Sequence, residues 1–180
     1  MADGSGGWRR CAFGPALDPM GPVETEPRAE PAITVAFALV KGQRPEWAVQ
    51  KLTEVGVDRI VPLVAARSVV RGSSVDRLRR VAREAAVQSR RAWLPVVDDV
   101  APVAVAASAP GAALAHPDGA PPGLDTPVVL VGPEGGWDPA ELGLALPRIR
   151  LGSRVLRTET AAVVAGALLC ALRDRVVGPR

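Results

Sequence analysis

The stretch VVLVGPEGGW, residues 128–137, runs from four consecutive apolar residues into a loop that holds three glycines. An apolar run of this length, rich in β-branched residues, is typical of a strand buried on both faces, as in a parallel sheet. Glycines in the following loop allow the backbone to approach a ligand closely. The stretch therefore predicts a parallel sheet with a binding loop at the end of one strand.

Two further short apolar runs are followed by loops of unusual composition. Residues 111–115 precede HPDG, residues 116–119, and the run at 149–151 precedes GSRVLRTET, residues 152–160. In parallel sheets, ligands bind beyond the carboxyl ends of the strands. We therefore predict that these two loops and the GPEGG loop meet and form one pocket.

The first half of the chain predicts a β-α-β start. Residues 33–40 are apolar throughout and predict a buried strand. A helix over 45–55 is predicted next, because Pro45 suits a first helical position and Gly56 suits the residue just past a helix end. Residues 59–64 predict the following strand.

The remaining helices complete an α/β pattern. Helices are predicted over 75–90, from Asp138 onward, and over 158–172. The last of these is apolar nearly all round, so we expect it to be covered on several sides, one of them by a partner subunit. Strands that alternate with helices predict an α/β domain with a mainly parallel sheet.

Composition limits the class of protein. The chain has 180 residues, 48% of them hydrophobic, and a net charge of +3. Its 18 Gly and 18 Pro fall mostly in 1–31 and 98–127, which predicts loops and linkers there. Cys11 and Cys170 fit no metal or redox spacing. The longest apolar run is too short to span a bilayer, and the start lacks a signal-peptide pattern, so we expect a cytoplasmic protein without a membrane partner.

Positive charge is concentrated in one segment. Residues 67–91 hold eight arginines against Asp76 and Glu84, an excess that could meet a phosphate backbone. A solvated helix face is an equally good interpretation of this segment from charge alone. The arginines are at positions 67, 71, 77, 79, 80, 83, 90 and 91.

Each loop is a weak signal by itself. A Gly-Gly pair after a strand is usually a turn, and His116 has no Cys, Asp or Glu partner at metal-ligand spacing, so no metal site is predicted. The GPEGG loop lacks the Lys-Ser/Thr of a phosphate-binding P-loop, which makes a nucleotide hydrolase the weakest interpretation.

Together, the motifs resemble the RsmE family. GPEGG at 132–136 is followed by Leu151-Gly152 and by LRTETA at 156–161, and this pairing is similar to the family signature. KLTEVGV at 51–57, Arg67-Ser68, and EAAVQSRR at 84–91 with Pro95 agree in the same order. The resemblance covers about residues 32–175.

The resemblance implies an S-adenosylmethionine (SAM)-dependent methyltransferase of the SPOUT superfamily that acts on N3 of a uridine in 16S ribosomal RNA, leaving S-adenosylhomocysteine. It also implies a parallel-sheet domain with a C-terminal deep trefoil knot over 32–180, and a homodimer. Residues 3–10 resemble a stretch from inside the family's N-terminal PUA-like β-barrel, so 1–31 are expected to be a partial barrel and linker.

The resemblance and the loops together predict three sets of site residues. Arg157 and Glu159 are the catalytic candidates, because both stand beside the predicted methyl donor, although an acid in a first helical turn also simply favours the helix dipole. The RNA-contact candidates are Lys51, Arg67, Arg71, Gln88, Arg90 and Arg91. The cofactor-binding candidates are His116, Leu130, Val131, Gly132, Pro133, Glu134, Gly135, Gly136, Leu151, Gly152, Leu156, Arg157, Thr158, Glu159, Thr160 and Ala161.

Two alternatives stay open beside this hypothesis. A SPOUT methyltransferase acting on another RNA, such as transfer RNA, would share the knot but lack the segment at 84–91. An RNA-binding fragment without catalysis would follow from an incomplete barrel, and it would transfer no methyl group from labelled cofactor.

Overall fold

A computed structural model describes residues 1–69 and 74–178 of the chain. Its centre is a sheet in the order β5-β4-β3-β8-β7-β9, in which every pairing is parallel. β6 (Ala101–Pro102) pairs with β4 beside β5. The strands are β3 (Thr34–Ala38), β4 (Arg59–Val64), β5 (Val96–Val97), β7 (Ala112–Ala120), β8 (Val128–Val131) and β9 (Arg148–Ile149). The predicted α/β class with a parallel sheet is confirmed.

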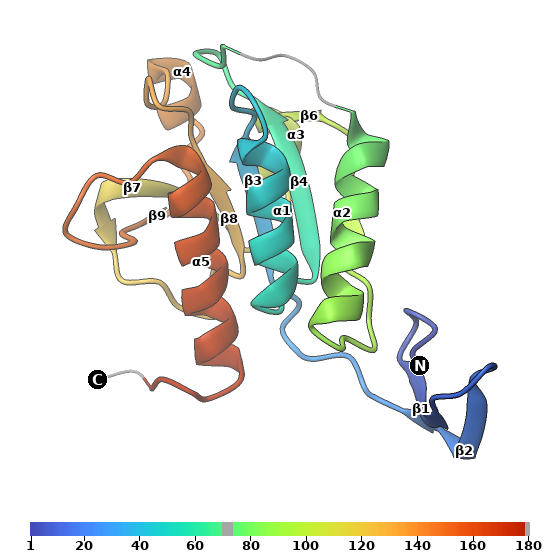
Figure 1. Cartoon of the computed structure of the whole chain (residues 1–180). Helices are drawn as coiled ribbons and strands as arrows, with labels where there is room; N and C mark the ends of the chain where they lie inside the picture. Colours follow the sequence, from blue (N-terminus) through green and yellow to red (C-terminus); the bar gives the residue numbers. More distant parts are fainter. Residues whose placement is uncertain (70–73, 179–180) are drawn as a thin grey trace.

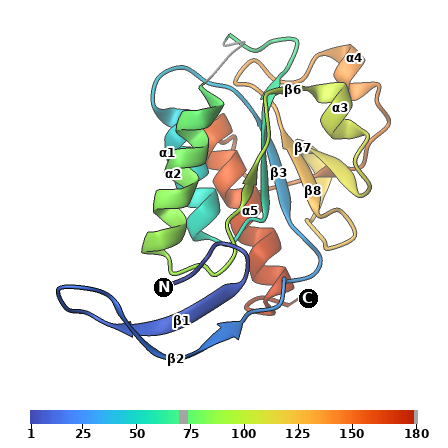
Figure 2. The ribbon, with the colours of Figure 1, turned by 90° about the vertical axis from the view of Figure 1, so that its right-hand side faces the viewer.

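Helices cover both faces of the sheet. Figure 2 shows α1 (Arg44–Glu54), α2 (Val75–Gln88) and α5 (Thr158–Arg173) on one side, and α3 (Val103–Ala107) and α4 (Pro139–Leu142) on the other. Alternate side chains of β3 enter the two cores, Val35 and Phe37 toward α1 and α5, and Ala36 and Ala38 toward α3. The strand is buried on both faces, as its unbroken apolar run predicts.

The helix ends follow the sequence signals. Gly56 has φ +100° just beyond α1, and the N–H groups of Gly56 and Val57 donate to carbonyls of the last turn. α2 ends at Gln88, two residues before its predicted end, because Arg90 adopts φ +56°. The N–H of Arg91 then donates to the Ala86 carbonyl and closes the helix.

One predicted loop is part of a strand. β7 continues from Ala112 to Ala120, so the HPDG segment lies within it, where the pairing with β9 is irregular between Ala115 and Ala120. The Arg150 N–H donates to the Ala120 carbonyl at 2.7 Å. A Cβ at Gly119 would overlap the backbone of Ile149, so this close approach of the two strands requires glycine.

Residues before β3 form a separate two-stranded sheet. β1 (Gly7–Ala12) and β2 (Asp18–Thr25) are antiparallel, which the absence of periodicity in 1–31 did not predict. The hairpin lies at the end of the parallel sheet where β3 begins (Figure 1). Trp93 contacts the segment that follows β2 directly. Its Nε1 donates to the Glu26 carbonyl at 2.8 Å, and the Arg28 guanidinium stacks over its ring. The partial barrel and the trefoil knot stay predictions.

No helix among the residues that the structure describes is long and apolar enough to cross a bilayer.

Candidate functional site

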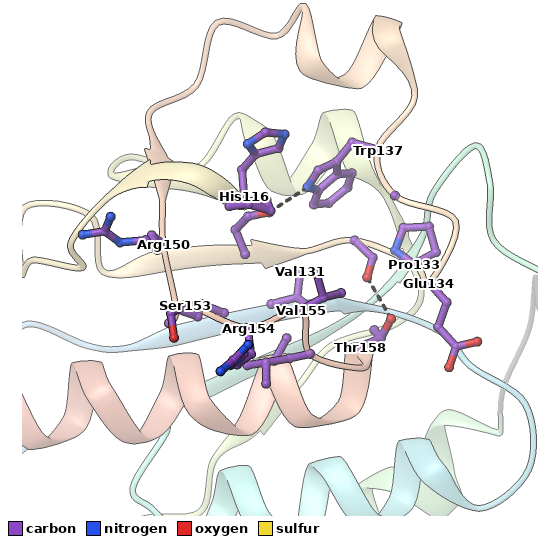
Figure 3. Close-up of a pocket in the computed structure, with 18 of the residues that line it drawn as sticks. His116, Val131, Pro133, Glu134, Trp137, Arg150, Ser153, Arg154, Val155 and Thr158 are labelled. Carbon is purple, nitrogen blue, oxygen red and sulfur yellow. Dashed lines mark hydrogen bonds between the residues drawn. The ribbon is translucent and has the colours of Figure 1, made fainter.

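A cavity of about 500 Å³ lies where β8 and β9 end, beside the middle of β7. Its volume is within the range of small-molecule and cofactor sites, about 300–1,000 Å³. The three segments that the sequence predicts to converge all contribute to its wall (Figure 3). The predicted cofactor-binding residues that line it are His116, Val131, Gly132, Pro133, Glu134, Gly136, Leu151, Gly152, Leu156, Thr158 and Ala161.

Two hydrogen bonds hold the segments together, and Figure 3 marks both. Thr158 Oγ1, at the start of α5, donates to the Gly132 carbonyl at 2.9 Å. Trp137 Nε1 donates to the Ala115 carbonyl at 3.0 Å. The loop after β8 is therefore fixed to α5 on one side and to β7 on the other, so the cavity wall is organised without a ligand.

Glycine is needed at two points of the cavity wall. An ideal Cβ at Gly132 would lie 2.9 Å from Trp137 Cε2, inside van der Waals contact. Gly136 has φ +72°, in the left-handed region that side chains rarely adopt. The glycine pattern of this loop thus reflects close packing and backbone conformation as well as an approach to a ligand.

Arg67 braces the loop after β8 from outside the cavity. Its Nη1 donates to the Gly135 carbonyl at 3.1 Å, and its Nε lies 3.7 Å from Asp138 Oδ2. Asp138 and Glu141 form a capping box at the start of α4, where the sequence predicts a helix from Asp138 onward, and Glu141 Oε1 also accepts the Ala66 N–H. Arg67, predicted to meet RNA, therefore has partners within the site.

Five predicted cofactor residues lie outside the wall of this cavity. Leu130 is fully buried in the core, and an added Cβ at Gly135 would face Arg67. Thr160 and Glu159 are absent from the lining, and Arg157 lines a neighbouring cavity. Side-chain direction within a loop, which the sequence does not reveal, separates these residues from the others.

Eight further residues line the cavity although the sequence did not predict them to bind the cofactor. Ser153, Arg154 and Val155 belong to the loop at 152–160, Pro117 belongs to HPDG, and Trp137 ends the stretch at 128–137, so the signal was present for these five. Leu142 and Arg150 come to the cavity only through the packing of α4 and β9. The eight are Ala115, Pro117, Trp137, Leu142, Arg150, Ser153, Arg154 and Val155.

The second cavity, of about 590 Å³, adjoins the first. Glu134, Val155 and Leu156 line both, and Arg44 and Arg157 complete the second. Glu134 lies at the opposite end of the first cavity from Arg150 (Figure 3). The guanidinium groups of Arg44 and Arg157 therefore stand beside the first cavity.

The two catalytic candidates differ in exposure. Arg157 is exposed and lines the second cavity. Glu159 is 7% exposed and lines neither cavity. Its Oε1 lies 3.7 Å from Arg44 Nη1, and its Oε2 is buried with no hydrogen-bond partner among the described residues. Arg157 can meet a ligand directly, whereas Glu159 faces Arg44.

Arg91 is not available for RNA in this structure. Its side chain is 14% exposed, and its Nη1 donates to the carbonyls of Thr53 and Val57 at 2.9 and 2.8 Å. Burial lowers the pKa of its guanidinium, opposed by the charge of Asp58. The RNA-contact prediction for Arg91 is corrected: the residue ties the end of α1 to the turn after α2.

The other RNA-contact candidates are more accessible. Gln88 and Arg90 are exposed, and Lys51 pairs with Glu54 at 2.8 Å. Arg71 lies outside the described residues.

Internal pairing accounts for more of the eight arginines than the sequence suggested. Arg77 pairs with Glu46, Arg79 with Asp76 and Asp99, Arg67 with Asp138, and Arg91 with Asp58. Within the described ranges, three arginines of the segment are exposed and have no ion pair, and we call them the α2 basic face: Arg80, Arg83 and Arg90.

No group of three or more His, Cys, Asp or Glu that could hold a metal ion occurs among residues 1–69 and 74–178.

Comparison with known proteins gives the family. The model of the RNA methyltransferase domain matches residues 27–170. The chain belongs to the RNA methyltransferase family. A Mycobacterium bovis ribosomal RNA small subunit methyltransferase E is 37% identical over 174 residues, which cover 83% of this chain and 66% of that relative. The resemblance to the RsmE family is therefore confirmed, and the chain spans just under two thirds of the relative's length.

Solved structures of methyltransferases share the fold. A probable rRNA-methyltransferase from Porphyromonas gingivalis superposes with a TM-score of 0.82 at 30% identity, over 98% of this chain and 84% of that one. A Legionella pneumophila methyltransferase in complex with the bound cofactor SAM gives 0.75 at 28% identity, over 86% and 72%. The expected SPOUT-type α/β fold is confirmed by these likenesses.

Proposed function

We propose that this protein transfers a methyl group from SAM to N3 of a uridine in 16S ribosomal RNA, as a cytoplasmic enzyme of the small subunit or its precursor. The proposal is supported by the small-subunit methyltransferase relatives and by the SAM-bound structure of similar fold. The observation that carries it in this chain is the cavity at the ends of β8 and β9, beside the middle of β7, whose wall holds eleven of the residues predicted for cofactor binding.

The residues present fit SAM on physical grounds. The cavity has the volume of a cofactor site. Because residues 132 and 136 in its wall are glycines, the wall there is bare backbone and no side chain takes up space at these positions. SAM supplies an electrophilic methyl group on a sulfonium ion when it is bound. The protein has to align the acceptor nitrogen with that group and exclude water, so binding and orientation are the main tasks of the wall.

Arg157 is the proposed charge-stabilising group. Uridine N3 is a weak acid that loses its proton before or during attack, and the negative charge spreads onto the uracil oxygens. An exposed guanidinium in the cavity adjoining the cofactor site is placed to stabilise that charge.

A homodimer is proposed as the working assembly. The face of α5 that is turned away from the core carries Val163, Val164, Ala167 and Leu168, all half-buried and apolar. A second copy packed there would remove this apolar surface from water.

The function is tested by binding and by transfer. Calorimetry with a chelator present is expected to show SAM binding without metal. Incubation with labelled SAM and unmodified small subunits is expected to give one N3-methyluridine in 16S RNA, located by nuclease digestion and mass spectrometry. Metal-dependent binding would contradict the proposal. Label in transfer RNA instead, or RNA binding without transfer, would contradict it and support one of the two alternatives.

The α2 basic face is proposed to meet the RNA backbone, and Arg90→Ala tests it. Losing one phosphate contact should weaken binding to all RNA sequences and flatten the slope of log K against log salt by about 0.7–0.9. Arg79→Ala is the matched control, because Arg79 already pairs with Asp76 and Asp99. Salt titrations that give the same slope for Arg90→Ala as for wild type would place the RNA elsewhere.

A further inference from the structure

Arg44, which the sequence analysis did not single out, lies at the boundary between the two cavities. It is the first residue of α1, and its guanidinium lines the second cavity together with Arg157. The cavity shares Glu134, Val155 and Leu156 with the proposed cofactor site. A group held in the second cavity would therefore be next to the first.

Two hydrogen bonds and one longer ion pair fix the Arg44 guanidinium. Its Nη1 donates to Glu134 Oε1 at 2.8 Å, its Nε donates to the Lys41 carbonyl at 3.2 Å, and Glu159 Oε1 lies 3.7 Å from Nη1. Glu134 and Glu159 come from the loop after β8 and the first turn of α5. The cation is thus held by the two segments that also form the cofactor cavity.

The burial of Glu159 indicates what it does. A buried carboxylate is costly unless it is paired, and the cation within 4 Å of Glu159 is Arg44. Glu159 lines neither cavity, so a ligand in the second cavity would meet Arg44 and not Glu159. Glu159 is placed to orient Arg44.

We propose that the second cavity holds the acceptor uracil, and that Arg44 acts beside Arg157 as a cation that stabilises the negative charge of the ring, with Glu159 as the residue that positions Arg44. This rests on the proposed function. A pre-oriented cation stabilises developing charge far better than one that must reorganise. The planar guanidinium also suits the oxygens on either side of N3.

The reaction balances with these groups. The N3 proton leaves to solvent through the open cavity, and the electron pair left on N3 forms the new N–CH₃ bond. The S–CH₃ bond breaks with its electron pair staying on sulfur, which yields neutral S-adenosylhomocysteine. Arg44 and Arg157 keep their protons and act only through their charge and hydrogen bonds.

Binding of barbiturate tests the cavity without RNA. Barbiturate is a pyrimidine ring that is anionic at neutral pH, so it imitates deprotonated uracil. With the protein saturated by S-adenosylhomocysteine, Arg44→Gln should weaken barbiturate binding about tenfold or more, as expected for one lost charge-assisted hydrogen bond. Arg148→Gln is the control, because Arg148 is exposed on β9 and lines neither cavity. Equal barbiturate affinity in Arg44→Gln and wild type would overturn the proposal.

Methyl transfer to two substrates gives the second test. Arg44→Gln should slow transfer to uridine-containing RNA by about a hundredfold or more, with S-adenosylhomocysteine affinity nearly unchanged. RNA in which 5-fluorouridine replaces uridine should recover much of that rate, because fluorine makes N3 more acidic and less dependent on the cation. An equal loss on both RNAs, or a parallel loss of S-adenosylhomocysteine affinity, would contradict the assigned role.

Glu159→Gln separates positioning from a direct role. If Glu159 acts through Arg44, the substitution should slow transfer in the wild-type background and have little further effect in Arg44→Gln. Additive losses would show that Glu159 acts independently and would overturn its positioning role. Should wild type methylate no uridine N3, the proposed function fails, whereas the barbiturate result would still show whether Arg44 forms an anionic-ring site.

Discussion

Gly132→Val is expected to remove most SAM affinity while the domain still folds. The new Cβ would lie 2.9–3.3 Å from three atoms of the Trp137 ring. That ring cannot yield easily, because it is buried and its Nε1 donates to the Ala115 carbonyl. The Gly132 carbonyl also accepts the Thr158 hydroxyl, so any shift of the loop would disturb the start of α5.

The expected size follows from overpacking. Overpacking at a tightly packed position costs about 1–3 kcal/mol. If that strain distorts the cavity wall, SAM should bind about 10- to 100-fold more weakly. The measurement is calorimetry with SAM, beside a thermal melt that shows folding.

Gly135→Ala is the matched control for Gly132→Val. Its Cβ would make an ordinary 3.6 Å contact with Arg67 Cβ, and Gly135 does not line the cavity. We expect SAM affinity close to wild type. Unchanged affinity in a folded Gly132→Val protein, or equal losses in the two variants, would show that this loop does not bind the cofactor through its close packing.

Asp58→Ala is expected to destabilise the fold more than any other change to a charged residue considered above. Asp58 Oδ2 accepts Arg173 Nη1 at 2.6 Å and the Ile33 N–H at 2.9 Å, and Oδ1 lies 3.6 Å from Arg91 Nη2. The Arg173 and Arg91 side chains are 6% and 14% exposed. Without Asp58, Arg91 would lose its anion and Arg173 would keep only Asp174, at a cost of about 3–5 kcal/mol.

Denaturant unfolding measures this loss, and Asp98→Ala is the control. Asp98 pairs with Arg59, whose side chain is 57% exposed, so its removal should cost about 1 kcal/mol or less. Similar losses of unfolding free energy for the two variants would mean that burial of the Asp58 ion pairs adds nothing to stability.

Arg91→Ala should also destabilise the protein, while the RNA affinity of the folded fraction stays unchanged. A flattened salt dependence of RNA binding in that variant would restore Arg91 as an RNA contact.

The sequence was most informative where local pattern dictates structure. The apolar run at 33–40 predicted a strand buried on both faces, and Val35 and Ala36 do enter opposite cores. Gly56 marked the end of α1 because its left-handed φ favours glycine. The convergence of three loops followed from the rule that parallel strands present their carboxyl ends at one edge.

Local pattern failed where a side chain's direction depends on distant residues. Arg90 and Arg91 are neighbours with the same charge, yet Arg90 is exposed and Arg91 is buried against Asp58 and the end of α1. Gly135 sits between cavity-lining residues but faces Arg67. The β1–β2 hairpin was missed because it buries no apolar face that would give a period-two pattern: every residue of β2 is exposed.

The sequence by itself determined the α/β class, the order of most strands and helices, the family, and the three segments that form the cavity, because these follow from hydrophobic period, turn residues and motif order. Only the tertiary structure decided which side chains enter each cavity. Arg44 and Glu159 are 115 positions apart in the chain, and only packing of α1 against α5 brings them within 3.7 Å. Pairing of charges over such separations depends on the relative placement of helices, which no local pattern encodes.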